Sequence, residues 1–213
     1  MSEAGIRERL AGAARKLSAM GMNPGRSGNV SARVPGGFLV TPSGMPYDAM
    51  VPEDLVLLDP SGDPRSGPRK PSTEWRLHRD IYARMPQAGA VVHTHSPFAT
   101  TLACLGRGIP SFHYEVAFAG GADIRCAGYA TFGTQELSDA ALGALEGRRA
   151  CLLANHGAVA WGEDIEDAAG LAEKVEALAR LYWQALQVGE PTLLPEAEMA
   201  RVLAKFANYG KDG

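Results

Sequence analysis

Short apolar segments separated by tight-turn signals are the feature of this sequence that most constrains its fold. Residues 29–34 and 38–41 both have strand-like composition, and 35–37 between them, Pro-Gly-Gly, is typical of a hairpin turn. Strands joined by so short a connection must pair antiparallel. Further strands are expected at 55–58, at 88–95 and within 150–161, where the apolar run reads as a buried hairpin or a broken strand. The sequence therefore favours a mixed or antiparallel sheet over a doubly wound parallel one.

Apolar residues at helical spacing occupy the intervals between these segments. Gly21 ends the first expected helix, and Asp164 has the chemistry of an N-cap for a long one. Helices are expected over 6–20, 73–85, 97–105, 134–145, from 164 onward, and over 196–207. The proline-rich segment 59–72 is expected to be a surface excursion, and 109–131 a mixture of strand and loop. Because the strands before residue 59 have too few partners to fold alone, the whole chain, 1–213, is predicted to be one layered α/β domain.

Composition excludes several classes of protein. The 21 Lys and Arg residues against 24 Asp and Glu leave a net charge of −3, which gives no support for a nucleic-acid binder. No apolar run approaches the ~18 residues of a membrane span, and the N-terminus has no signal-peptide pattern. The cysteines form no CxxC pair, so Cys104, Cys126 and Cys151 are expected to be small buried hydrophobic residues in a reducing compartment. We expect a soluble, cytoplasmic protein.

Histidines concentrate at the ends of two apolar segments. His93 and His95 are two residues apart, so in a strand both imidazoles point to one face. Such a pair is as compatible with a structural role as with a metal site. His156 ends a second apolar segment, before Gly157, which would let the backbone pass close to a ligand; a capped core histidine is the alternative. Glu74, at a helix start, is a fourth candidate ligand, although a glutamate there ordinarily just complements the helix dipole.

Two loops have the composition of a phosphate-binding cradle. Residues 28–31, Gly-Asn-Val-Ser, and 41–44, Thr-Pro-Ser-Gly, offer backbone N–H groups with small polar side chains. Ser72 and Thr73 add donors at a helix start. Each element taken singly is more often a plain turn or cap. The sequence has no GxxxxGK[ST] motif and no GxGxxG motif after a strand. It therefore has neither a Walker-type nucleotide site nor the usual dinucleotide-binding turn.

In their order along the chain, these motifs resemble the class II aldolase/adducin family. The resemblance rests on 28–31, 41–44, the Pro-Ser-Thr-Glu-Trp of 71–75, the Val-His-Thr-His of 92–95, the Asn-His-Gly of 155–157, and segments 130–134 and 205–210. It covers nearly the whole chain. Within the family it is greatest to the enzymes that act on L-fuculose 1-phosphate.

The resemblance implies an aldolase with a divalent metal, Zn²⁺ or alternatively Mn²⁺ or Co²⁺. It would cleave a ketose 1-phosphate to dihydroxyacetone phosphate and an aldehyde through a metal-stabilised enediolate. The implied metal ligands are Glu74, His93, His95 and His156, and Glu74 would also be the catalytic acid and base. The implied phosphate-binding residues are Gly28, Asn29, Ser43, Gly44, Ser72 and Thr73.

The resemblance further implies a single α/β/α domain with a mixed, largely antiparallel central sheet. It implies a homotetramer with active sites between subunits, a phosphorylated sugar as substrate, and neither nucleic acid nor membrane as partner. Tyr114 would reach the aldehyde oxygen from a neighbouring subunit, and Tyr209 in the tail would cover the site.

Other functions stay open within the resemblance. A decarboxylase of phosphorylated sugar acids uses the same chemistry, whereas the pentulose-phosphate epimerases of the family have Asp in place of Glu74. A non-catalytic adducin-like binding module would have lost the metal ligands, and this chain keeps them. A Schiff-base aldolase would need a buried lysine, and none of the five lysines ends an apolar strand.

Overall fold

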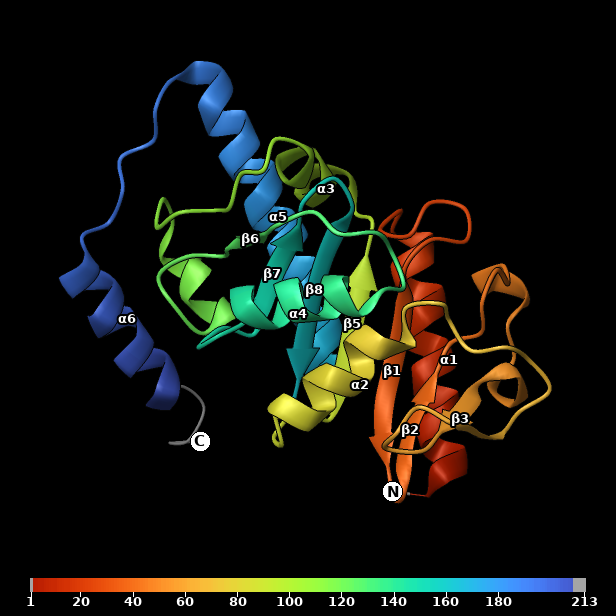
Figure 1. Cartoon of the computed structure of the whole chain (residues 1–213). Helices are drawn as coiled ribbons and strands as arrows, with labels where there is room; N and C mark the ends of the chain where they lie inside the picture. Colours follow the sequence, from red (N-terminus) through yellow and green to blue (C-terminus); the bar gives the residue numbers. More distant parts are fainter. Residues whose placement is uncertain (1, 209–213) are drawn as a thin grey trace.

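A computed structural model of the protein describes residues 2–208 and places eight strands in one sheet. The order across the sheet is β4-β3-β2-β1-β5-β8-β7-β6 (Figure 1). All neighbouring strands pair antiparallel except β6 and β7. The strands are β1 (Asn29–Val34), β2 (Gly37–Val40), β3 (Val56–Leu58), β4 (Pro64–Ser66), β5 (Ala90–Thr94), β6 (Cys126–Ala127), β7 (Ala150–Leu153) and β8 (Gly157–Gly162).

Tight turns produce the antiparallel pairing, as the sequence predicts. A two-residue loop joins β1 to β2, and its second residue, Gly36, has φ of 82°, which glycine adopts without strain. The expected hairpin within 150–161 is β7 and β8, which pair from Ala150 with Ala160 to Leu153 with Gly157. The two hairpins lie on either side of β5, which pairs with both β1 and β8.

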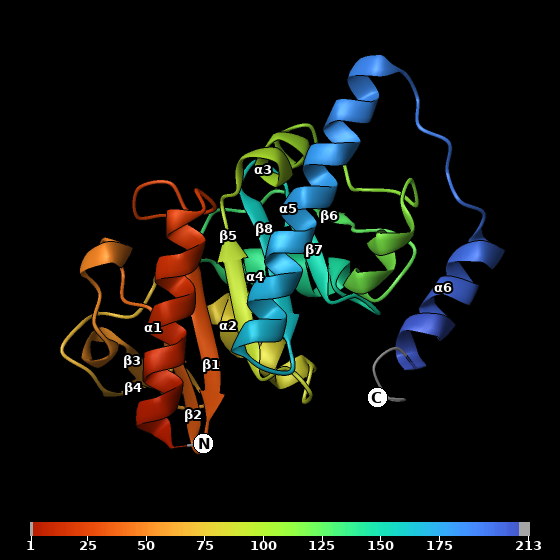
Figure 2. The same ribbon diagram turned by 180° about the vertical axis from the view of Figure 1, so that it is seen from behind.

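Helices cover both faces of the sheet, which confirms the predicted α/β/α architecture. α2 and α4 lie on one face, and α1, α3 and α5 on the other (Figures 1 and 2). Alternate residues of each strand enter two separate cores: Val92 packs on the α5 side and Val91 on the α2 side. The helices are α1 (Glu3–Ala19), α2 (Trp75–Arg84), α3 (Pro97–Cys104), α4 (Gln135–Ala144), α5 (Ile165–Val188) and α6 (Glu196–Asn208).

Local chemistry sets the helix ends. The Asp164 side chain accepts a hydrogen bond from the N–H of Asp167 at 2.9 Å, which confirms it as the N-cap of α5. Thr134 caps α4 in the same way. α2 begins two residues later than expected, because Glu74 takes the N-cap position with non-helical backbone. No helix within the described range 2–208 is long and apolar enough to cross a bilayer.

Three local expectations need correction. The excursion 59–72 contains β4, an exposed strand that pairs with β3. The segment 109–131 contains a 3-10 helix, η3 (Tyr114–Ala119), which its mixed composition does not predict. Cys104 is exposed and Cys126 half-buried, so only Cys151 is the buried residue expected; α3 turns Cys104 outward at its last residue.

Candidate metal centre and phosphate pocket

The two histidines of the His-x-His motif come from β5, at the middle of the sheet. His93 lies opposite Asn29 of β1 and Val159 of β8, and it is fully buried. His95 follows the end of the strand on the same face, and the two Nε2 atoms are 3.0 Å apart. The strand alternation therefore brings both imidazoles to one point, as the spacing predicts.

His156 reaches the same point from the β7–β8 turn. The preceding residue, Asn155, has φ of 55°, a left-handed conformation that asparagine tolerates better than most residues. The ring of His156 lies 4.8 Å from the rings of both His93 and His95. Gly157 has a different role from the one expected: a Cβ there would collide with the carbonyl oxygen of Thr94 in β5, so it permits close strand packing rather than ligand approach.

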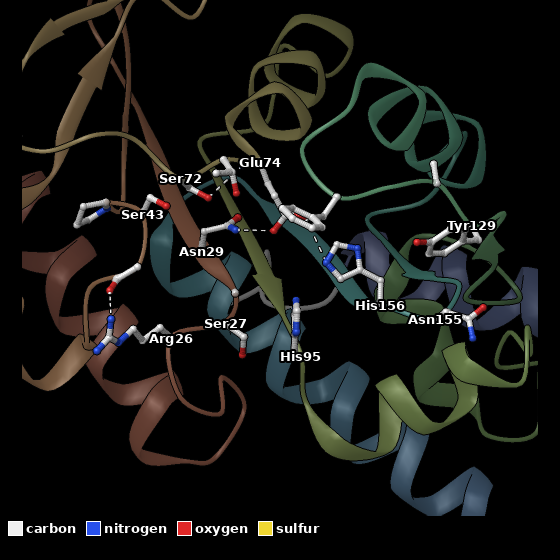
Figure 3. Close-up of a pocket in the computed structure, with 16 residues that line it drawn as sticks. Arg26, Ser27, Asn29, Ser43, Ser72, Glu74, His95, Tyr129, Asn155 and His156 are labelled. Carbon is white, nitrogen blue, oxygen red and sulfur yellow. Dashed lines mark hydrogen bonds and ion pairs between the residues drawn. The ribbon is translucent and has the colours of Figure 1, made fainter.

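Glu74 closes the group from the N-terminus of α2. Its Oε2 lies 3.2 Å from His93 Nε2, and its Oε1 lies 3.3 Å from His156 Nε2. The carboxylate is buried, and the four candidate ligand atoms all lie within 4.8 Å of one another. Figure 3 shows three of these residues, Glu74, His95 and His156, at the edge of a pocket. These are the Glu74, His93, His95 and His156 of the sequence prediction, so three distant segments converge as expected.

Burial and neighbouring charge shift the pKa values in this cluster. Burial and the proximity of His93 lower the pKa of both His95 and His156 to about 4, so each imidazole is neutral near pH 7 and has a lone pair to offer a cation. Burial alone would raise the pKa of the Glu74 carboxyl. The neighbouring His93 and His156 and a hydrogen bond from Asn29 lower this pKa by more than burial raises it. The pKa of the Glu74 carboxyl therefore lies well below its usual value. The same carboxylate raises the pKa of His93 against the effect of burial.

The donor set fits a divalent metal ion. Three imidazole nitrogens and one carboxylate oxygen are ligands that zinc and related ions take. His93 Nδ1 lies 2.9 Å from the Ala158 carbonyl oxygen and donates to it, so Nε2, which faces His95 and Glu74, is the nitrogen that could bind a cation. Glu74 Oε1 is buried yet accepts no hydrogen bond, an unsatisfied position that a cation would occupy.

The predicted phosphate-binding residues line one pocket beside this cluster. Its volume is about 290 Å³, at the small end of the range for small-molecule sites. Two loops lie side by side there: Ser43 N–H donates to the Lys70 carbonyl at 3.0 Å, and Ser72 N–H donates to Thr41 O at 3.0 Å. Every predicted phosphate residue lines the pocket: Gly28, Asn29, Ser43, Gly44, Ser72 and Thr73.

Gly28 couples the loop 28–31 to the histidine cluster. Its φ is 71°, and a Cβ there would overlap the Asn23 side chain and lie 2.7 Å from the carbonyl oxygen of His93. Only glycine lets the loop press against the strand that carries the histidine. The hydroxyl of Tyr47 donates to the Gly28 carbonyl at 2.6 Å and fixes the loop from the other side.

Several lining residues are absent from the sequence prediction. Figure 3 shows Arg26 and Ser43 on one side of the pocket and Tyr129 and Asn155 on the other. Arg26 donates to the Gly44 carbonyl at 3.0 Å, so a cationic side chain lies beside the loop 41–44, whose own residues offer only backbone N–H groups and small polar side chains. Because Arg26 lies two residues before Gly28, its place in the sequence could have marked it as a candidate phosphate-binding residue. Tyr129 and Phe132 are exposed aromatic residues, and no periodicity marks them.

Of the two predicted catalytic tyrosines, Tyr114 does not line this pocket. Tyr114 opens η3, is 48% exposed, and lies against Phe206 of α6 instead of among the lining residues. Tyr209 lies outside the described residues. No lysine among residues 2–208 lines the pocket.

Comparison with known proteins decides the family. The model of the "Class II Aldolase and Adducin N-terminal domain" family matches residues 8–183. The chain belongs to the class II aldolase/adducin family. The 5-methylthioribulose-1-phosphate/5-deoxyribulose-1-phosphate aldolase of Rhodospirillum rubrum is 56% identical over 98% of this chain and 94% of its own length. The L-fuculose phosphate aldolase of Escherichia coli strain K12 is 44% identical over 92% and 91%.

Solved structures give the same result for this class II aldolase-family chain. An L-fuculose 1-phosphate aldolase matches with a TM-score of 0.93 and 38% identity, covering 97% of this chain and 98% of that one. The predicted family, fold class and enzyme class, a lyase, are thereby confirmed. Enzymes of this family are metal-dependent, and the Glu74 cluster is a group that could hold the metal.

Proposed function

We propose that this chain is a Zn²⁺-dependent aldolase that cleaves a ketose 1-phosphate to dihydroxyacetone phosphate and an aldehyde. The observation that carries the proposal is the convergence of Glu74, His93, His95 and His156 beside a pocket lined by two phosphate-type loops. Mn²⁺ or Co²⁺ would suit the same donors. A binding module without catalysis has no need for a buried carboxylate among three histidines.

The residues of the pocket divide the work of cleavage. Arg26, Ser43 and Ser72 bind the phosphate on one side, which directs the sugar carbons toward the histidine cluster. Glu74, His93, His95 and His156 would hold a divalent cation, which would supply Lewis acidity for the negative charge that develops during cleavage. Glu74 moves the proton at the carbon that becomes the hydroxymethyl group of dihydroxyacetone phosphate. Its ionised state near neutral pH suits it to receive that proton in the synthetic direction.

For the sugar, we propose a 5-deoxypentulose 1-phosphate or its 5-methylthio derivative ahead of L-fuculose 1-phosphate. The relative named for the first two compounds is 56% identical to this chain, against 44% for the relative named for fuculose phosphate. The exposed rings of Tyr129 and Phe132 offer an apolar surface to a methyl or methylthio end. Cleavage between carbons 3 and 4 would release acetaldehyde from 5-deoxyribulose 1-phosphate.

Tyr114 takes part in this proposal only through a second copy of the chain. Its exposed ring does not line the pocket of its own subunit. If Tyr114 acts on the aldehyde oxygen, the ring must therefore reach the pocket of a neighbouring subunit. We therefore propose a homotetramer with the active sites between subunits. Mixing a Glu74→Gln variant with a Tyr114→Phe variant, after dissociation and reassembly, should restore activity beyond that of either alone. Additive residual activity would remove Tyr114 from the role.

The central test is product formation with measured metal content. After exhaustive chelation, purified protein should release no aldehyde from 5-deoxyribulose 1-phosphate, and added Zn²⁺ should restore release. Glu74→Gln should lose most exchange of the hydroxymethyl proton of dihydroxyacetone phosphate with solvent. Glu173→Gln changes a carboxylate paired with Lys16 away from the pocket and is the matched control. Full activity without metal, or carbon dioxide from a phosphorylated sugar acid in place of aldehyde, would refute the aldolase.

A further inference from the structure

A line of buried polar side chains runs from Glu74 between strand β1 and helix α2. Asn29 Nδ2 lies 2.9 Å from Glu74 Oε2, as the dashed line in Figure 3 marks, and Asn29 Oδ1 contacts His78 Nε2. His78 Nδ1 lies 2.6 Å from Ser31 Oγ, which lies 2.7 Å from the Tyr82 hydroxyl. His78 and Ser31 are fully buried, and Asn29 and Tyr82 nearly so.

The sequence spacing explains how this line forms. Residues 29 and 31 are alternate residues of β1 and so share the face that looks toward α2. Residues 74, 78 and 82 are four apart and share the helix face that looks back. The contacts therefore alternate between strand and helix, on a sheet face that also carries His93 and apolar side chains such as Val40 and Val91.

Chemistry fixes the direction of every hydrogen bond in this line. A carboxylate can only accept, so the Asn29 amide must turn its NH₂ toward Glu74 and its oxygen toward His78. His78 Nε2 must then carry the proton. Burial, with the nearby His93, lowers the pKa of His78 to about 3, so the ring is neutral and Nδ1 is an acceptor. Ser31 donates to Nδ1 and accepts from Tyr82, so all four donors point toward Glu74.

We propose that His78, held in one tautomer by Ser31 and Tyr82, is a positioning residue that fixes the Asn29 amide against Glu74. The proposal deepens the function proposed above and rests on it only for the proton transfer assigned to Glu74. Without the His78 donor, the oxygen of the Asn29 amide loses its partner, and only the NH₂ contact with Glu74 holds the amide. The amide then no longer fixes Glu74 at the position between His93 and His156.

The line orients Glu74 and does not carry protons to it. An amide neither releases nor takes up a proton readily near neutral pH, so transfer would stop at Asn29. At the far end, burial raises the pKa of Tyr82, and its hydroxyl stays protonated. Arg33 continues the alternation by donating to the Tyr82 carbonyl at 2.9 Å, and its guanidinium covers the Tyr82 ring. The helix and strand are thus held in one register over the length of the line.

Paired variants test the proposal. His78→Leu removes the donor to Asn29, and kcat should fall about 10- to 100-fold, the range for residues that orient a ligand, with KM within threefold. His78→Gln keeps an N–H that can face Asn29 and should recover at least tenfold of that loss. Ser31→Ala frees the tautomer and should cost about tenfold in kcat. Ser138→Ala is the matched control, because that fully buried serine bonds Asp80 instead.

A second readout does not use activity. Nitrogen-15 NMR of the imidazole rings, with and without added Zn²⁺, should show His78 as the Nε2–H tautomer in the native protein and a mixture in Ser31→Ala. Zn²⁺ affinity, measured by chelator competition, should fall about tenfold in His78→Leu and stay unchanged in Ser138→Ala.

The outcomes separate this inference from the proposed function. An Nδ1–H tautomer in the native protein, or equal loss of kcat in Ser31→Ala and Ser138→Ala, overturns the positioning role. If the native protein cleaves no ketose 1-phosphate, the proposed aldolase function is refuted. The measured tautomer of His78 and the measured Zn²⁺ affinities would still decide whether His78 positions Glu74.

Discussion

The buried neutral His78 predicts a measurable loss of stability in acid. Burial holds its pKa at about 3 in the folded protein, against about 6.5 in the unfolded chain. Below pH 6.5 the unfolded chain therefore takes up a proton that the folded protein refuses, so the free energy of unfolding falls as the pH falls. A full proton difference is worth about 1.4 kcal/mol per pH unit. Because the unfolded chain is already half protonated at this residue at pH 6.5, lowering the pH from 6.5 to 5.0 should remove about 1.6 kcal/mol.

Urea unfolding of chelator-treated protein at several pH values tests this magnitude. His78→Gln removes the titrating group. Between pH 6.5 and 5.0 the stability of the variant should therefore fall by about 1.6 kcal/mol less than that of the native protein. The other histidines are present in both proteins and cancel in the comparison. Ser138→Ala, which leaves His78 in place, should keep the native slope. Parallel stability profiles for the native protein and His78→Gln would refute the reasoning.

Three further predictions concern the pocket. Gly28→Ala should lower the free energy of unfolding by more than about 1 kcal/mol and raise KM, because the methyl group would meet Asn23 at a positive φ; native stability in urea would contradict this. Arg26→Ala should raise KM for a ketose 1-phosphate about tenfold with kcat nearly constant, through loss of a charged donor; an unmoved KM removes Arg26 from phosphate binding. Zn²⁺ at ~100 times its dissociation constant should stabilise the metal-free protein by about 2.7 kcal/mol in thermal melts; an unchanged Tm would mean that the histidine cluster does not bind it.

The parts of the site that depend on local periodicity could be predicted from the sequence. Strand alternation alone places His93 and His95 on one face, and the structure agrees. The glycine and hydroxyl residues of the two loops were likewise recognisable, since turn chemistry is local. His156 and Glu74 were assigned through the family resemblance, because their approach depends on how a hairpin and a helix pack far along the chain.

Features that depend on long-range contacts escaped the sequence. β4 is a strand only because β3 offers it a partner, and its own composition reads as loop. Tyr129 and Phe132 line the pocket through the path of a loop, which no period encodes. His78 was present as an isolated histidine on a helix. Its partners on β1 become visible only once the strand and the helix are known to lie face to face.

The pairing of β5 with β1 has a consequence for assembly of the molecule. Asn29 lies opposite His93 in that pairing, and a slip by one residue would turn both strand histidines toward α5 and put Val92 and Thr94 in their place. A misassembled sheet would thus offer no set of nitrogens to an ion. A divalent ion added during refolding would be retained only by molecules in which β5 pairs with β1 in the native register. The amount of bound ion would then measure the fraction of molecules with the native sheet.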